Sequence, residues 1–220
     1  MKTKHGLWVP DREFHLPPPT RGEMAILPWF GALLEVGLWD RFGNILYQER
    51  VPSRSPLKQF LQILLLLTNP IGFNDPVKDT GGTNRTISYG SAYYNKLELS
   101  GGASSLYGIV IGTDATAVDI LNNALIAQIV AGSGVGQMLY QTSVGSTAVT
   151  VADPDATFVW YRNFNNNSGG TITVRETGLY VRSVDGYGTG YFCIVRDTPT
   201  AVAVPDGGGC YVKYTLKITE

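Results

Sequence analysis

The stretch "GGCYVKYTLKITE" at residues 208–220 constrains the fold more than any other part of the chain. Every second position in it is apolar, and the apolar set is Cys210, Val212, Tyr214, Leu216 and Ile218. Side chains of a strand alternate between the two faces of a sheet, so the pattern predicts a strand over 209–219 with one buried and one solvated face. Strands of this kind are typical of antiparallel sheets.

Other segments with strand character follow one another closely. The alternation of Leu34, Val36 and Leu38, followed by "NILYQERV", predicts a hairpin with its turn at 40–44. The further predicted strands cover 92–99, 106–112, 137–144, 156–164, 171–182 and 190–197. The predicted fold class is therefore mainly β, an antiparallel β-sandwich or barrel of jelly-roll or immunoglobulin-like type.

The connection between strands 156–164 and 171–182 reads "NNNSGG", and Gly169 and Gly170 supply residues that tolerate positive φ in a tight turn. Beyond this turn the apolar positions change parity, from Ile172 to Leu179. An extra residue near 176–178 would restore the register, so we expect a β-bulge with Gly178 at its special position.

One segment has helical periodicity. In "SRSPLKQFLQILLLLTNP", Ser55 is the expected N-cap, Pro56 occupies the first helical position, and Asn69-Pro70 ends the helix. The pattern predicts one short helix near 56–67, buried on most of its circumference. A second short helix is expected at 119–131, and residues 70–90 are expected to form a loop.

Residues 1–23 are expected to form an extended N-terminal arm, ahead of a single β-rich domain over 24–220. Proline is frequent in this segment and favours polyproline II geometry, with a reach of about 70 Å when extended. Its apolar side chains need a surface to lie on, either on its own domain or on a neighbouring subunit. The predicted subunit-interface residues are Trp8, Phe14, Leu16, Pro17, Pro18 and Pro19.

Charge and hydropathy exclude several classes of partner. The net charge is −1 and only 16% of the residues are charged, so we expect neither a nucleic acid nor a membrane surface as partner. The strongest apolar run, at 57–68, is shorter than the roughly 20 residues that a membrane span needs. The N-terminus has no apolar run typical of a signal peptide, so we expect synthesis in the cytoplasm.

The residues that catalyse reactions are sparse. Both histidines, His5 and His15, fall in the arm, so the β-rich part lacks the commonest general base and no zinc site is expected. The "GSGVG" at 132–136 lacks the flanking strand and helix of a phosphate loop. The aspartates that could pair for glycosidase chemistry fall in predicted turns, where turn formation explains them: Asp114, Asp119, Asp153, Asp155, Asp185 and Asp206.

Cys193 and Cys210 are the two cysteines, on consecutive predicted strands. Two buried free thiols are the favoured interpretation, and a disulfide between them is the alternative. The prediction is a non-enzymatic protein with no catalytic residue, cofactor or metal.

Four phrases of the C-terminal half, in this order, carry a resemblance to a known family. They are "LYGIVIGTDATAV" (106–118), "ALIAQIVAGSGVGQMLY" (124–140), "YRNFNNNSGGTITVRETGLYV" (161–181) and "YFCIVRDTPTAVAVPDGGGCYVKYTLKI" (191–218). From about residue 36 to the end, the chain resembles a group of virion structural proteins of tailed bacteriophages, either capsid decoration or tail components. The arm lies outside the resemblance.

The resemblance implies a structural protein of a phage virion, made in the host cytoplasm, whose partners are itself and other virion proteins such as major capsid or tail proteins. Because no fibre-like repeat is present, a head decoration or cement protein is favoured. The alternatives are a tail, connector or baseplate component, or a receptor- or carbohydrate-binding module of the tail that uses Tyr94 and Tyr187. A glycan-cleaving enzyme is a third class.

Overall fold

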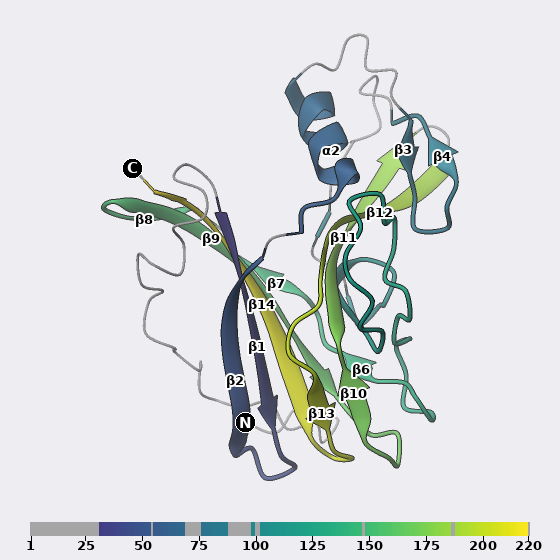
Figure 1. Cartoon of the computed structure of the whole chain (residues 1–220), viewed down its shortest axis with the longest axis vertical. Coiled ribbons are helices and arrows are strands. Elements are labelled where there is room, and N and C mark those ends of the chain that lie inside the picture. Colours follow the sequence, from purple (N-terminus) through teal and green to yellow (C-terminus); the bar gives the residue numbers. More distant parts are fainter. Residues whose placement is uncertain are drawn as a thin grey trace.

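The computed structural model describes residues 31–53, 55–68, 76–87, 98–99, 102–146, 148–185 and 188–219. The fold is mainly β, with one helix among these residues and no closed barrel, so the sandwich form of the predicted fold class is confirmed (Figure 1). Its elements are β1 (Gly31–Trp39), β2 (Ile45–Ser53), α2 (Lys58–Thr68), β3 (Val77–Lys78), β4 (Asn84–Arg85), β5 (Gly108–Gly112), β6 (Leu139–Tyr140), β7 (Val144–Gly145), β8 (Thr150–Ala152), β9 (Asp155–Asn165), β10 (Ile172–Val174), β11 (Glu176–Asp185), β12 (Gly188–Asp197), β13 (Val202–Val204) and β14 (Gly209–Thr219).

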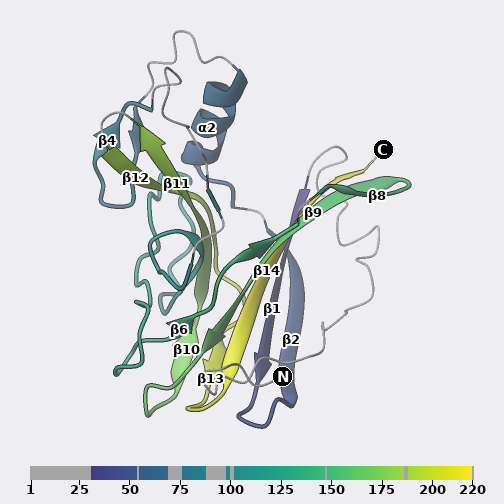
Figure 2. The same cartoon turned by 180° about the vertical axis from the view of Figure 1, so that it is seen from behind.

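Two layers make up the sandwich. The larger sheet has the order β2-β1-β14-β9-β6, and β7 and β8 also pair with β9. The second layer consists of the sheet β12-β11-β5 and the pair β10-β13. Figure 2 shows the same two layers from behind, with the β3-β4 pair and α2 at the end of the second layer.

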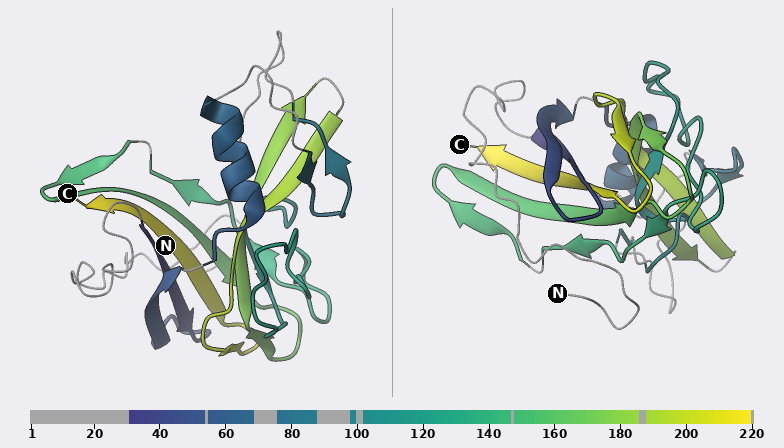
Figure 3. Two further views of the ribbon diagram at one scale, coloured as in Figure 1. Left: turned by 45° about the horizontal axis from the view of Figure 1, so that its top comes forward. Right: turned by 90° about the horizontal axis from the view of Figure 1, so that it is seen from below.

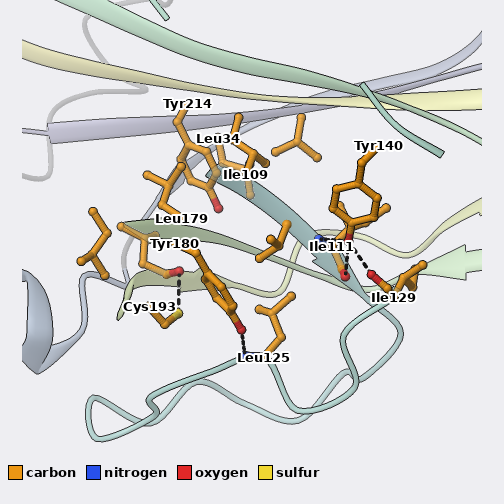
Figure 4. Packing of buried hydrophobic residues seen from close by; sticks show 14 of the residues in the cluster. Leu34, Ile109, Ile111, Leu125, Ile129, Tyr140, Leu179, Tyr180, Cys193 and Tyr214 are labelled. Atoms are coloured by element: carbon orange, nitrogen blue, oxygen red, sulfur yellow. Dashed lines mark hydrogen bonds between the residues drawn. The ribbon is translucent and has the colours of Figure 1, made fainter. Parts of the chain in front are cut away.

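The core lies between these layers (Figure 4). It contains buried tyrosines whose hydroxyl groups all form hydrogen bonds. Tyr214 of β14 is fully buried, and its hydroxyl shares a 2.7 Å hydrogen bond with Thr177. The Tyr140 hydroxyl donates to the carbonyl of Ile129 at 2.6 Å, and the Tyr180 hydroxyl accepts from the N–H of Leu125 at 2.6 Å. A buried phenol without a partner would destabilise the fold, so these bonds also anchor the segment 125–129.

The strand predicted over 209–219 is confirmed as β14, but its outer face is less solvated than expected. Tyr211 on that face is buried, stacks on Trp39 and covers Gly37. Lys217 is also buried and pairs with Asp155 at 2.5 Å. Ile218, on the face that was expected to be buried, is 55% exposed.

Helix α2 begins later than expected. Pro56 forms a β-bridge with Val195 and the N–H of Leu57 donates to the carbonyl of Ile194 at 2.9 Å, so the chain is still tied to β12 before the helix starts at Lys58. The predicted burial on most of its circumference is wrong. Ile63 and Leu66 are buried, whereas the opposite side exposes Leu61, Leu64 and Leu65.

Two other predictions, the second helix and the long loop, differ from the structure. Residues 119–131 do not form the predicted helix but a series of turns and isolated bridges. Within the predicted loop 70–90, the described part contains the short β3-β4 pair, closed by Asp79, which accepts the N–H groups of Gly81 and Thr83 at 3.0 and 2.8 Å.

The bulge predicted at Gly178 is absent. β11 pairs with β5 without a register shift, and the shift against β12 lies between Leu179 and Tyr180, opposite Ile194. The parity change has another cause: the chain leaves one sheet after Val174 and enters another at Glu176, so β10 and β11 are separate strands.

The glycines of this region have different roles. Gly169 has φ of 82°, as a tight turn needs, and Gly170 completes the turn. Gly178 is needed for close packing, because a Cβ there would lie 3.0 Å from the carbonyl oxygen of Val195 and 3.1 Å from Leu125.

Gly37 provides a test of the packing on the outer face. A Cβ at Gly37 would overlap the ring of Tyr211, so we expect Gly37→Ala to lower the free energy of unfolding by about 1–3 kcal/mol. Gly31→Ala, in the same strand with open space around it, is the matched control and should change it by less than about 0.5 kcal/mol. Urea unfolding measures both, and equal effects would contradict the packing of Tyr211 on Gly37.

Candidate functional site

A fully buried ion pair lies between β11 and β12. The Nε of Arg196 donates to Oε2 of Glu176 at 2.9 Å, and neither side chain is exposed. Two charges removed from water at this depth need further hydrogen bonds to be tolerated. Both side chains obtain these bonds from the segment 113–128.

The pair holds that segment from two directions. The carboxylate of Glu176 accepts the N–H groups of Ile126 and Ala127, at 3.1 and 2.8 Å. The guanidinium of Arg196 donates to the carbonyl of Thr116 and to Oδ1 of Asn122, both at 3.0 Å. The irregular segment 113–128 is therefore held by side-chain charges in addition to its few backbone bonds to β5 and to the start of α2.

Asp114 lies at the edge of this pair, with its Oδ1 3.7 Å from Nη2 of Arg196. Hydrogen bonds from the side chain and the N–H of Thr116, and then the charge of Arg196, hold the pKa of Asp114 below its usual value. Asp114 is consequently a charged turn residue at neutral pH. A general acid needs a raised pKa, and the pKa of Asp114 is shifted in the opposite direction.

Arg162 forms a second buried cationic centre, whose hydrogen-bond partners among the described residues are backbone carbonyls. It donates to the carbonyls of Gln141 at 2.6 Å, Ile109 at 2.8 Å and Tyr107 at 3.1 Å, and also to that of Gly102. These bonds tie residues 102–107 and 139–145 to β9.

The charge of Arg162 persists despite its burial. Desolvation lowers the pKa of Arg162 to about 10, so the group stays protonated at neutral pH. Its guanidinium lies over the ring of Tyr140, 4.8 Å from the ring centre. Such cation–π contact and four carbonyl acceptors account for its stability inside the protein.

On the outer face of the large sheet, Glu35 is a buried carboxylate with several partners. Nη2 of Arg50 lies 3.2 Å and Nζ of Lys213 3.6 Å from its Oε2, and the Tyr211 hydroxyl donates to its Oε1 at 3.0 Å. A carboxylate held by two cations and a phenol is a structural centre, and it does not have the unpaired environment of a general acid or base.

Of the aspartates singled out from the sequence, Asp114, Asp119 and Asp206 accept backbone N–H groups in turns, and Asp155 pairs with Lys217. Asp153 lies in the exposed turn between β8 and β9, and the side chain of Asp185 is outside the described residues. The "GSGVG" at 132–136 forms a turn in which Gln137 accepts the N–H of Gly134, and no helix follows it.

Of the other predicted site residues, the structure describes the three glycines and does not describe the arm. Gly169, Gly170 and Gly178 lie in the second layer and its turn, away from any cluster of reactive side chains. The arm residues Trp8, Phe14, Leu16, Pro17, Pro18 and Pro19 lie outside the described residues, as do Tyr94 and Tyr187.

The exposed apolar side chains are what sequence reasoning missed. They fall on three parts of the described chain. Three groups are defined here by their residues: the helix face (Leu61, Leu64, Leu65), the loop face (Ile120, Leu121, Ile126, Val130) and the sheet end (Val149, Val151, Ile218). Each of these side chains is at least 46% exposed. Where exposed apolar side chains form a contiguous patch, the patch is a candidate surface for binding another molecule.

Within the described ranges, no three His, Cys, Asp or Glu side chains are grouped so as to hold a metal ion. In the same part of the chain, no helix combines the length and apolar character that crossing a bilayer requires. Comparison with known proteins found no match to a family model, to a curated protein or to a solved structure.

The buried ion pair supplies a test of how the segment 113–128 is held. We expect Arg196→Met to lower the free energy of unfolding by about 3–5 kcal/mol, because it leaves the Glu176 carboxylate buried without its cation. Lys213→Met, which removes a partly exposed cation 3.6 Å from Glu35, is the control and should cost less than about 1 kcal/mol.

Hydrogen exchange distinguishes the local from the global effect of this change. The amides of Ile126 and Ala127 should lose protection first in Arg196→Met, since their acceptor is Glu176. Unchanged protection there would contradict the role of the pair in holding the segment.

Both cysteines are free and buried, which confirms the favoured interpretation of two thiols. Burial raises the pKa of Cys210 to about 12 and raises that of Cys193 further. The folded state therefore favours the neutral thiols. Titration of the two thiols leaves the free energy of unfolding unchanged below about pH 8.5 and lowers it as the pH rises toward 12.

We expect both thiols to react with an aromatic disulfide reagent at pH 8 at least ~100-fold more slowly in the folded than in the unfolded chain. Thiol counting in urea without reductant should give two per chain. Fast reaction of the folded protein, or no thiols in urea, would contradict the structure.

Proposed function

We propose that this protein is a non-enzymatic structural component of a tailed-phage virion, which assembles with itself and with other virion proteins. The observation that carries the proposal is that the buried charged side chains are bonded within the protein and hold its framework together. The buried charged groups Arg196, Glu176, Arg162 and Glu35 all bond to the protein's own backbone or side chains.

A scaffold of this kind suits assembly better than catalysis. The buried charges hold long irregular segments in place, and these segments and the sheet end expose several large apolar side chains. Apolar surface is what subunit interfaces bury, and symmetric assembly repeats one such contact around a ring or lattice. The resemblance of the C-terminal half to phage virion proteins supports the same proposal.

Within the particle we propose the head surface, as a decoration protein that binds the major capsid protein. The arm at 1–23 would contact neighbouring subunits through Trp8, Phe14 and Leu16. A tail, connector or baseplate position is the alternative, and purified heads and tails separate the two: a decoration protein cosediments with preformed heads and not with tails.

The arm is tested on the full chain. We expect the triple change Trp8→Ala, Phe14→Ala, Leu16→Ala to convert an oligomer of defined mass into monomer, because it removes the apolar anchors. Light scattering measures the mass, and His5→Ala, His15→Ala is the matched control in the same segment, with no loss of assembly expected.

Deleting residues 1–23 should have the same effect as the triple change while the melting temperature stays within about 4 °C of wild type. A full chain that is monomeric even in the presence of purified heads and tails would overturn the proposed function. An oligomer that persists after deletion would overturn the role of the arm alone.

A further inference from the structure

The core-facing side of the large sheet continues beyond the layer that covers it. Its register aligns rows of side chains across β1, β14 and β9, because directly paired residues share a face. The row Leu34–Tyr214–Trp160 packs in the core. The next row along the same face is Ala32–Leu216–Phe158, and the row after it is Ile218–Ala156–Val151.

Burial falls steadily along these rows. Tyr214 is fully buried, Leu216 is half-buried, and Ile218 is 55% exposed. On the neighbouring strand β8, Val151 is 76% exposed. Figures 1 and 3 show this end of the sheet, with β8 and the end of β14, projecting away from β11 and β12, so the second layer stops before it.

The two faces of this projection differ in chemistry. The other face carries Thr150, Asp155, Thr157 and Lys217, with the Lys217–Asp155 ion pair. The core-facing side has no charged residue in its last two rows. A solvated sheet end would be expected to carry polar residues on both faces, and here the apolar pattern of the core continues to the end.

We propose that this surface, formed by Val151, Ala156, Phe158, Leu216 and Ile218, binds the segment 1–30 of a neighbouring copy of the chain. The inference rests on the proposed function, in which that segment links subunits, and it adds the surface on the neighbour that receives it. Val151 and Ile218 are exposed, so the surface is open to a segment of another molecule.

The position where the described chain starts supports this occupant. Gly31, the first residue of β1, pairs with Lys217, so the preceding 30 residues join the fold at the projecting end of the sheet. From Leu16 to Gly31 the chain can span up to about 50 Å. When the projecting ends of two copies face each other, each segment therefore reaches the other copy's surface.

The chemistry also fits this occupant. The surface is apolar and uncharged, and the segment offers Trp8, Phe14 and Leu16 as apolar anchors. Large aromatic side chains contribute most to such interfaces when they enter an apolar patch and leave water. The triple proline before Thr20 reduces the entropy lost when the segment is bound.

The test uses the full chain with Val151→Glu and Ile218→Glu together. We expect the apparent dissociation constant of self-assembly to rise at least about tenfold, because two charges would be buried against the segment. Val135→Glu, at a side chain that is 95% exposed on a distant turn, is the inert control. Leu61→Glu tests the helix face as a rival surface.

A disulfide trap identifies the contact directly. One chain carries Trp8→Cys and the other Val151→Cys, and mixing them under mild oxidation should give a crosslinked heterodimer, since the two native cysteines are buried. Replacing the second chain by one with Val135→Cys should give none.

The outcomes separate this inference from the proposed function. Assembly that survives the double glutamate change, or a crosslink that forms equally with Val135→Cys, overturns the receiving surface and leaves the arm as a linker. A wild-type chain that never self-associates, alone or on purified heads and tails, overturns both.

Discussion

The antiparallel pairing of β14 with β9 is the constraint on which the rest of the structure depends. It runs without a register shift from Gly209–Asn165 to Thr219–Asp155, and β1 pairs with the other side of β14 over nine of these positions. Because side chains alternate along every strand, this one register decides which residues form the core. It also places Arg162 beside Val212 on the inner face and the Lys217–Asp155 pair on the outer face.

The second layer is held to this sheet by charges as well as by apolar contacts. Residues 102–107 and 113–131 contain almost no regular structure, so their backbone groups have few partners of their own. Arg162 and Arg196 supply these partners from β9 and β12 and satisfy carbonyls that would otherwise be buried unpaired. A guanidinium is well suited to this role, because it presents five N–H donors in a plane and stays charged. The same use leaves neither arginine available for a ligand.

Alternation within each strand is local information, and it was enough to predict β1, β2, β9, β12 and β14 close to their observed bounds. The failures came from contacts between distant segments. Pro56 and Leu57 match a helix start in sequence, but their bonds to Val195 and Ile194 delay the helix to Lys58. Gly178 resembled a bulge because a change of sheet at Arg175 produces the same change of parity as an extra residue. The roles of Glu176 and Arg196 could not be predicted, since a charged residue in a strand is normally assigned to the solvated face.

The uncovered end of the large sheet follows from the different directions in which the two layers run (Figures 1 and 3). β9 and β14 have 11 residues each and β11 and β12 have ten each, so the two layers differ little in length. β11 and β12 instead run toward α2, while β8 and the end of β14 project to the other side (Figure 1). A second layer that diverges from the large sheet cannot cover the whole of its apolar face, so one end of that face meets either water or another segment of chain. Val151 and Ile218 keep the apolar pattern there, although exposed apolar side chains lower the solubility of an isolated chain. In the proposed assembly a second chain covers this surface, and that contact would explain why the apolar pattern of the core continues where the two layers diverge.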